Sequence, residues 1–253
     1  MIRTENLSFG YSKQKIILNN VTIGIDQPGI YSVIGLNGAG KSTLLKLLAG
    51  ILKPSKGKVL LGSNDIADMN YSELSTHRSY LPQNVFLPVD FPVIDFIRYG
   101  AYAEMDIFSR ISAQREKTIH SVMEEMNLLD LKNRMTSTLS AGEMQRIHIA
   151  KALVQGGKLI LMDEPVSTID VSFRKKFITI MRKLAVDRIV ILVTHDLQLA
   201  FGLSKRIICV GNGSIIADDS PEKTIHLLEG LYRERIPYII HDKKFIFIDE
   251  EEM

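Results

Sequence analysis

The stretch "GLNGAGKSTLLKLLAG", residues 35–50, follows the apolar run "IYSVI" of residues 30–34. Its Gly35, Gly40, Lys41 and Ser42 have the spacing G-x-x-x-x-G-K-[ST] between an expected strand and an expected helix. Small residues let successive backbone N–H groups curl around phosphates, and the helix N-terminus adds donors and a positive dipole end. The stretch therefore predicts a phosphate-binding loop; the alternative is a glycine-rich turn that opens a helix by chance.

Two side chains of this loop have expected tasks in nucleotide binding. Lys41 can reach the β- and γ-phosphates, and the Ser42 hydroxyl can face a magnesium ion that bridges two phosphates. A hydrolytic site also needs a second metal ligand and a group that activates water.

The run "KLILMDEP", residues 158–165, supplies candidates for both. It predicts a buried strand that ends at Asp163 and Glu164, at the carboxyl edge where α/β sheets bind ligands. Asp163 would hold magnesium through water, and Glu164, which points the other way along the strand, would act as general base. An acidic pair after a strand is also a common helix-start signal. Only together with the phosphate-binding loop does it indicate nucleotide hydrolysis.

Composition excludes several classes of function. Lys and Arg number 31 against 29 Asp and Glu, a net charge of +2, which gives no general positive field for nucleic acid. The one cysteine, Cys209, lies in the apolar run "RIICV" and is expected to be a buried strand residue. No run approaches the roughly 18 apolar residues of a membrane span, and no signal-peptide pattern precedes the first strand. We expect a cytosolic protein that contacts a membrane only through a partner.

The pattern along the 253 residues predicts an α/β fold with one domain over 1–253. Residues 1–83 and 157–253 are expected to form a mainly parallel sheet with an antiparallel β part at the front, and 84–156 an inserted helical subdomain. Near the C-terminus we expect a hairpin turning at Asn212-Gly213, one helix starting after Ser220, and a last hairpin in the tail.

The segment "LSAGEMQRIHIAKAL" begins a helix with Ser140 as N-cap and Glu143 as its capping-box partner. Ala141 and Gly142 leave this helix start bare, so its N–H groups could face a phosphate on another molecule. Here the chain resembles the ATP-binding cassette (ABC) ATPases, a P-loop NTPase family whose signature is written LSGGQ.

The resemblance extends along nearly the whole chain. It implies that Tyr11 stacks on the adenine of ATP and that three further segments contact the nucleotide. These are the phosphate loop (Gly35, Leu36, Asn37, Gly38, Ala39, Gly40, Lys41, Ser42 and Thr43), the signature (Ser140, Ala141, Gly142 and Glu143) and the D-loop residue Asp170. It places Glu164, His195 and Gln83 in catalysis, and Ser42, Gln83 and Asp163 at magnesium. Taken singly, Tyr11 is equally well a surface aromatic, Gln83 a solvated loop residue and His195 a strand-end residue; their order along the chain carries the resemblance.

Two positions depart from the family signature: Ala141 replaces its first glycine and Glu143 its glutamine. The "SAGE" sequence, "FPVIDFIRYGAY" at 91–102 and the tail after "LLEGLY" resemble the importer ATPases for iron–siderophore, haem or cobalamin uptake. Manganese or zinc importer ATPases are the nearest alternative. ABC ATPases that work without a membrane partner, and non-catalytic nucleotide switches, are further ones.

The resemblance implies the cofactors and partners as well. They are ATP with Mg2+, a second ATPase subunit in a head-to-tail homodimer, integral membrane permease subunits, and indirectly a substrate-binding protein. Residues near 84–104 would receive a short helix of the permease, which would hold the chain at the inner face of the cell membrane.

Overall fold

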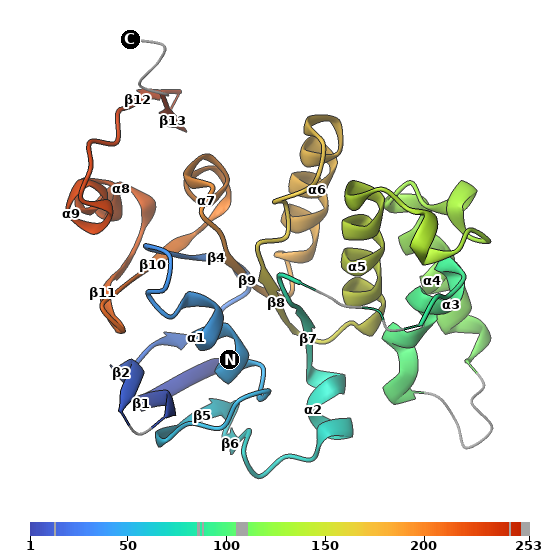
Figure 1. Cartoon of the computed structure of the whole chain (residues 1–253), viewed down its shortest axis with the longest axis horizontal. Coiled ribbons are helices and arrows are strands. Elements are labelled where there is room, and N and C mark those ends of the chain that lie inside the picture. The colour runs from blue at the N-terminus through green and yellow to red at the C-terminus, as the bar shows by residue number, and fades with distance from the viewer. Residues whose placement is uncertain (13, 85–86, 88, 105–110, 243, 249–253) are drawn as a thin grey trace. The chain divides into compact units, whose positions relative to one another are not determined.

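A computed structural model describes residues 1–12, 14–84, 87, 89–104, 111–242 and 244–248 (Figure 1). The chain divides into two compact units, residues 1–69 with 180–253 and residues 70–179.

The first unit begins with the expected antiparallel strands. Their order is β2-β1-β5-β6, with β3 paired to β1; the bounds are β1 Ile2–Ser12, β2 Lys15–Val21, β3 Gly24–Ile25, β5 Lys56–Leu61 and β6 Asn64–Asp65. Within β1, every second residue is buried from Ile2 to Thr4 and again from Leu7 to Phe9, because successive side chains point to opposite faces. A register shift against β5 interrupts the alternation between these two pairs.

A second group of strands in this unit carries the phosphate-binding loop. β4 (Gly29–Ile34) lies between β9 (Ile189–Val193) and β10 (Arg206–Gly211), parallel to both, and β11 (Ser214–Asp219) is antiparallel to β10. β9 is buried along its whole length, and β4 in all but its first residue. Such uninterrupted burial is typical of parallel strands covered on both faces.

The helices of the first unit pack on these strands. They are α1 (Lys41–Leu48), α7 (Leu197–Leu203), α8 (Pro221–Thr224), the 3-10 helix η4 (Ile225–Leu227) and α9 (Leu228–Tyr232). The single helix expected after Ser220 is thus divided into α8, η4 and α9. Within it Ile225, Leu228 and Leu231 all enter the core that also contains Ile34 and Cys209, and this packing outweighs the propensity for one regular helix.

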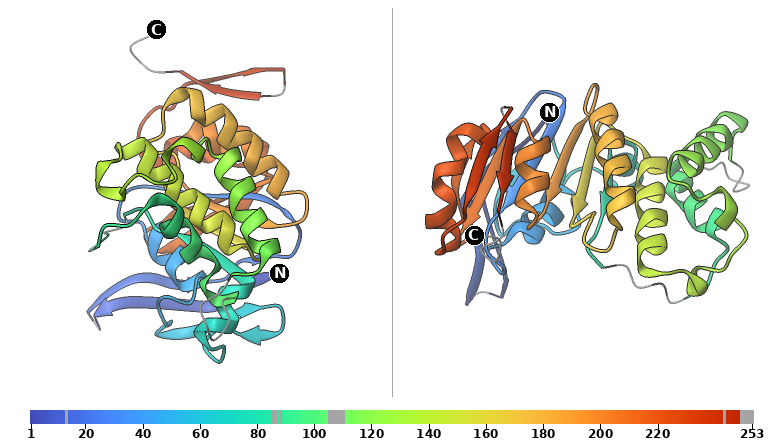
Figure 2. Two further views of the ribbon diagram at one scale, coloured as in Figure 1. Left: turned by 90° about the vertical axis from the view of Figure 1, so that its right-hand side faces the viewer. Right: turned by 90° about the horizontal axis from the view of Figure 1, so that it is seen from above.

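The tail forms the expected hairpin, β12 (Tyr238–His241) with β13 (Lys244–Phe247), and lies over α7 (Figures 1 and 2). Gln198 of α7 donates to the Phe245 carbonyl at 2.9 Å and accepts from the Phe247 N–H at 3.1 Å. The rings of Phe245 and Phe247 meet the Phe201 ring edge to face.

The second unit contains the helical segments and two parallel strands, β7 and β8. Its elements are α2 (Tyr71–His77), β7 (Arg78–Leu81), α3 (Val93–Arg98), η1 (Tyr99–Glu104), α4 (Ala113–Glu125), η2 (Leu129–Leu131), η3 (Thr136–Thr138), α5 (Ala141–Gln155) and β8 (Leu159–Asp163); α6 (Val171–Leu184) runs from this unit into the first. α5 packs against α3 and α4. Among the described residues, every helix is too short or too polar to cross a lipid bilayer.

Candidate functional site

The phosphate-binding loop joins β4 to α1 through backbone conformations that suit glycine. Gly35 has φ +146° and Gly40 φ +104°. A Cβ on Gly35 would lie 2.0 Å from the Val210 carbonyl oxygen, and one on Gly40 would lie 2.7 Å from the Leu18 side chain. Both glycines of the motif are therefore required by the fold, through close approach as well as by φ.

The start of α1 is built to receive an anion. Gly40 is its N-cap, and no side chain caps the helix, whose first turn holds no acidic residue. A helix N-terminus of this kind offers backbone N–H groups and a positive dipole end. The loop and helix start therefore fit a phosphate group.

Lys41 lies inside this loop and is only 7% exposed. Its ammonium group donates to the carbonyl oxygens of Gly35 at 2.7 Å and Leu36 at 3.0 Å. Ser42 is half-buried and Thr43 buried in the same first turn.

Tyr11 and His195 belong to the same unit as the loop. Tyr11 is the second-to-last residue of β1; it is 62% exposed, and its ring meets the Phe9 ring edge to face at 5.0 Å. An exposed, braced ring of this kind can stack on a base. His195 is exposed just past β9, and β9 pairs in parallel with β4, so the histidine and the loop emerge at the same sheet edge.

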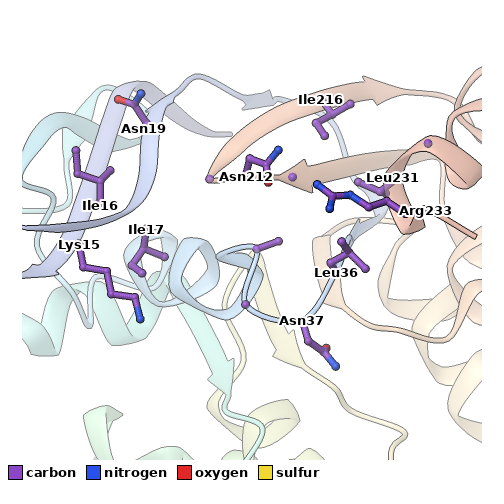
Figure 3. Close-up of a pocket in the computed structure, with 15 residues that line it drawn as sticks. Lys15, Ile16, Ile17, Asn19, Leu36, Asn37, Asn212, Ile216, Leu231 and Arg233 are labelled. Atoms are coloured by element: carbon purple, nitrogen blue, oxygen red, sulfur yellow. The ribbon is translucent and has the colours of Figure 1, made fainter.

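A pocket of about 460 Å³ adjoins the loop in this unit (Figure 3). The loop residues Leu36, Asn37, Gly38 and Ala39 form one wall. The other walls come from β2, the β10–β11 turn and the end of α9, through Lys15, Ile16, Ile17, Asn19, Gly211, Asn212, Gly213, Ile216, Gly230, Leu231 and Arg233. The sequence pattern gave no sign of Lys15 or Arg233 at this place, because no motif links them to residues 35–43.

The acidic pair lies in the second unit, at the end of β8. Asp163 is 1% exposed and Glu164 7% exposed. Glu164 has φ +50° although it is neither glycine nor asparagine and precedes Pro165, which disfavours helical backbone conformations. Residues kept in such strained conformations cluster at functional sites.

The loop after Glu164 is held by the helix that the signature begins. Gln145 of α5 is buried and donates to the Pro165 carbonyl at 3.0 Å. A Cβ on Gly142 would lie 3.2 Å from the Thr168 carbonyl oxygen, a tight approach between the signature and the same loop. Gln145 was not among the expected site residues, and only its place one turn into α5 pointed to it.

The capping box expected at the signature is present. Glu143 accepts from the Ser140 N–H at 2.8 Å and from the Ser140 hydroxyl at 2.9 Å, and its own N–H donates to the Ser140 Oγ at 3.3 Å. The hydrogen bonds from the Ser140 backbone and side chain hold the pKa of the Glu143 carboxyl below its usual range. Ser140 and Ala141 are exposed, so the helix start that bears the signature is accessible.

The remaining two expected residues also lie in the second unit. Gln83 is exposed, shortly after β7. Asp170 accepts from the Phe173 N–H at 2.8 Å and from the Ser172 hydroxyl at the start of α6, and these bonds lower the pKa of its carboxyl. Of the region near 84–104 expected to meet a permease, residues 85, 86 and 88 lie outside the described residues.

That region contributes to a groove of about 850 Å³ in the second unit. Ile94 and Arg98 of α3 line it with residues of α4 and η2, which are Glu116, Lys117, Ile119, His120, Met123, Leu129 and Asp130, followed by Lys132 and Asn133. Arg98 bridges the two helices by donating to Glu116 at 3.0 Å.

Residues 18–167 match the family model described as ABC transporter. The chain is 35% identical over 227 residues to the hemin import ATP-binding protein HmuV of Nitrobacter winogradskyi, covering 86% of this chain and 81% of that protein. It is 30% identical to the iron(3+)-hydroxamate import ATP-binding protein FhuC of Bacillus subtilis, covering 86% and 81%.

Solved structures agree with this result. The chain matches the dimeric structure of MJ0796, a bacterial ABC transporter cassette, with a TM-score of 0.77 and 25% identity over 87% of this chain and 99% of that one. The α/β fold of P-loop type that the sequence predicted is confirmed.

Proposed function

The chain belongs to the ABC transporter family, and on this premise we propose that it is the ATP-hydrolysing subunit of an importer for an iron–siderophore, haem or related chelate. The observation that carries the proposal is the phosphate-binding loop with Lys41 inside it, together with a buried carboxylate pair at a strand end. The relatives of this chain, HmuV and FhuC, are ATP-binding proteins of hemin import and iron(3+)-hydroxamate import.

Each expected site residue has a role in this proposal. Lys41 and the N–H groups at the start of α1 bind the β- and γ-phosphates, and Tyr11 stacks on adenine. Glu164 takes the proton of the attacking water as general base, and His195 contacts the γ-phosphate from the neighbouring strand end.

The predicted magnesium ligands offer oxygen atoms, which this ion prefers. Asp163 supplies a carboxylate at a buried strand end, Ser42 a hydroxyl in the first turn of α1, and Gln83 an amide oxygen. When bound, the ion would neutralise phosphate charge. Asp163 and Ser42 would orient it, and Gln83 would contact it from the loop after β7.

The signature is proposed to serve a second copy of the chain. Ser140, Ala141, Gly142 and Glu143 begin an exposed helix start, and in the proposed homodimer they contact the ATP that the partner's loop holds. Asp170 would contribute from the neighbouring loop. The dimer of the MJ0796 cassette supports this arrangement.

We propose that the helical part of the chain, residues 84–156, binds the permease and so couples ATP hydrolysis to transport. The groove between α3, α4 and η2, which we call the docking groove, offers the half-buried apolar side chains of Ile94 and Leu129 over the buried Met123, with a charged rim. A short amphipathic helix of a permease fits such a groove. The permease would hold the chain at the inner face of the membrane and would link it indirectly to a substrate-binding protein.

A phosphate-release assay tests the proposal. The purified chain with ATP and Mg2+ is expected to release phosphate, and removing Mg2+ is expected to stop the release. Glu164→Gln, which keeps the shape but removes the base, is expected to lower turnover by about 10²–10⁴-fold while ATP still binds. Turnover of Glu164→Gln at the native rate would refute the assignment of the base. Absence of any turnover in the native chain, alone and with its co-purified permease, would refute the ATPase itself.

A further inference from the structure

The pocket beside the phosphate-binding loop has more charge than the motif supplies. Of the described residues that line it, the charged ones are Lys15 and Arg233, and both are basic. They share the pocket with Asn37 and Gly38 of the loop. Two cations without an acidic neighbour on the pocket wall favour an anionic ligand.

Arg233 occupies a backbone position that glycine usually fills. It is the residue after α9 and has φ +60° and ψ +28°, and its N–H donates to the Glu229 carbonyl at 2.8 Å. Helices commonly end with glycine in this left-handed conformation, because a Cβ is strained there. An arginine in this position therefore lowers the stability of the fold, and strained backbone positions of this kind cluster at binding sites.

The position of Arg233 relative to the loop is fixed by packing. Leu228 and Leu231 of α9 are 1% and 6% exposed and share a core with Ile34, the last residue of β4 before Gly35. The same core thus holds the end of α9 and the strand that feeds the loop. Figure 3 shows the Arg233 side chain running from the end of α9 across the pocket, toward the turn that carries Asn212.

We propose that Arg233 is a nucleotide-binding residue, whose guanidinium group binds phosphate oxygens of the ATP held by residues 35–43, with Lys15 as a second cation on the opposite wall. A guanidinium group presents a planar fork of donors that matches phosphate oxygens, and such charge-assisted bonds are among the stronger ones in proteins. The inference rests on the proposed function, since it names a further contact to the same nucleotide.

The test compares Arg233→Gly and Arg233→Ala with Arg235→Ala, a control that removes an exposed arginine two residues on, outside the pocket. Dissociation constants of ATP and ADP are measured by displacement of a fluorescent ATP analogue from the full chain. Both Arg233 variants are expected to bind ATP about tenfold or more weakly, whereas Arg235→Ala stays within about twofold.

Arg233→Gly also separates binding from folding. Glycine relieves the left-handed strain, so this variant is expected to melt at the same or a higher temperature than the native chain while it binds ATP more weakly. Native affinity in Arg233→Gly would overturn the inference, and so would an equal loss in Arg235→Ala. If the native chain itself bound no ATP, the proposed function would fail instead, so the two failures are distinguishable.

Discussion

The ammonium group of Lys41 donates a hydrogen bond of 2.7 Å to the carbonyl oxygen of Gly35, six residues earlier in the same loop. Together with the bond to the Leu36 carbonyl, this contact holds the lysine inside the loop at 7% exposure. The positive charge of Lys41 therefore lies beside the start of α1 before a nucleotide binds. Little conformational entropy of this side chain is lost on binding.

Removal of this charge is expected to weaken nucleotide binding itself. Lys41→Met should raise the dissociation constant of ATP by about tenfold or more, because a charge-assisted contact to phosphate is lost. Lys46→Met is the matched control, since Lys46 lies in the last turn of the same helix. Titration calorimetry measures both; equal affinities for the Lys41 variant and the native chain would contradict the role given to this lysine.

The strained backbone at Glu164 predicts that a glycine variant is more stable than an alanine variant. Glu164→Gly and Glu164→Ala both remove the carboxylate, but only glycine adopts φ +50° without strain. The glycine variant is expected to exceed the alanine variant by about 1 kcal/mol, or about 2–4 °C in melting temperature. Scanning calorimetry decides this, and an alanine variant at least as stable as the glycine variant would show that the backbone stores no strain there.

The buried His148 predicts a pH dependence of stability. Its ring is 6% exposed and meets the Phe96 ring edge to face, and burial, with a smaller effect of Lys151, lowers its pKa from 6.5 to about 4. Because the folded-state pKa lies below the unfolded value, the unfolded state binds the proton first as pH falls. Stability is therefore full above pH 6.5 and is lost as pH falls from 6.5 toward 4.

The expected loss over that interval is on the order of 1–3 kcal/mol. Urea unfolding of the native chain and of His148→Leu at several pH values measures it, and the variant should lose this part of the dependence. A direct NMR titration of His148 provides a second measurement. A folded-state pKa near 6.5 would remove the basis of the prediction.

The docking groove gives a prediction about coupling. Ile94→Glu places a charge among its apolar side chains and is expected to abolish co-purification with the permease, while the isolated chain keeps its ATPase activity. Gln114→Glu on α4 is the control, because Gln114 is exposed and does not line the groove. Loss of ATPase activity as well as co-purification in Ile94→Glu would count against this groove as the docking surface. Loss of co-purification in Gln114→Glu would do the same.

Local sequence patterns were sufficient for the elements that depend on local chemistry. Three such features agree with the sequence pattern, because each depends on residues a few positions apart. They are the glycine-rich loop of residues 35–40, the capping box of Ser140 and Glu143, and the hairpin at Asn212-Gly213. The buried state of Cys209 followed from its apolar neighbours.

Long-range packing decided what the sequence did not predict. The helix after Ser220 is divided into α8, η4 and α9, whose apolar residues share a core with β10 and with Ile34 of β4, a strand far earlier in the chain. The left-handed backbone of Glu164 and the approach of Arg233 to the loop also depend on tertiary structure, and no periodicity or motif encodes them.

Whether two copies of the chain share each ATP is decided by the mass of Glu164→Gln in solution, measured by light scattering with and without ATP. Without nucleotide the variant is expected to be a monomer of 28.5 kDa, and with ATP a species of twice that mass, because in the proposed dimer the signature of each copy closes over the nucleotide of the other. Addition of Ser140→Arg to the same chain should prevent the doubling while ATP still binds. A variant that is saturated with ATP and stays monomeric would show that the chain does not dimerise around the nucleotide.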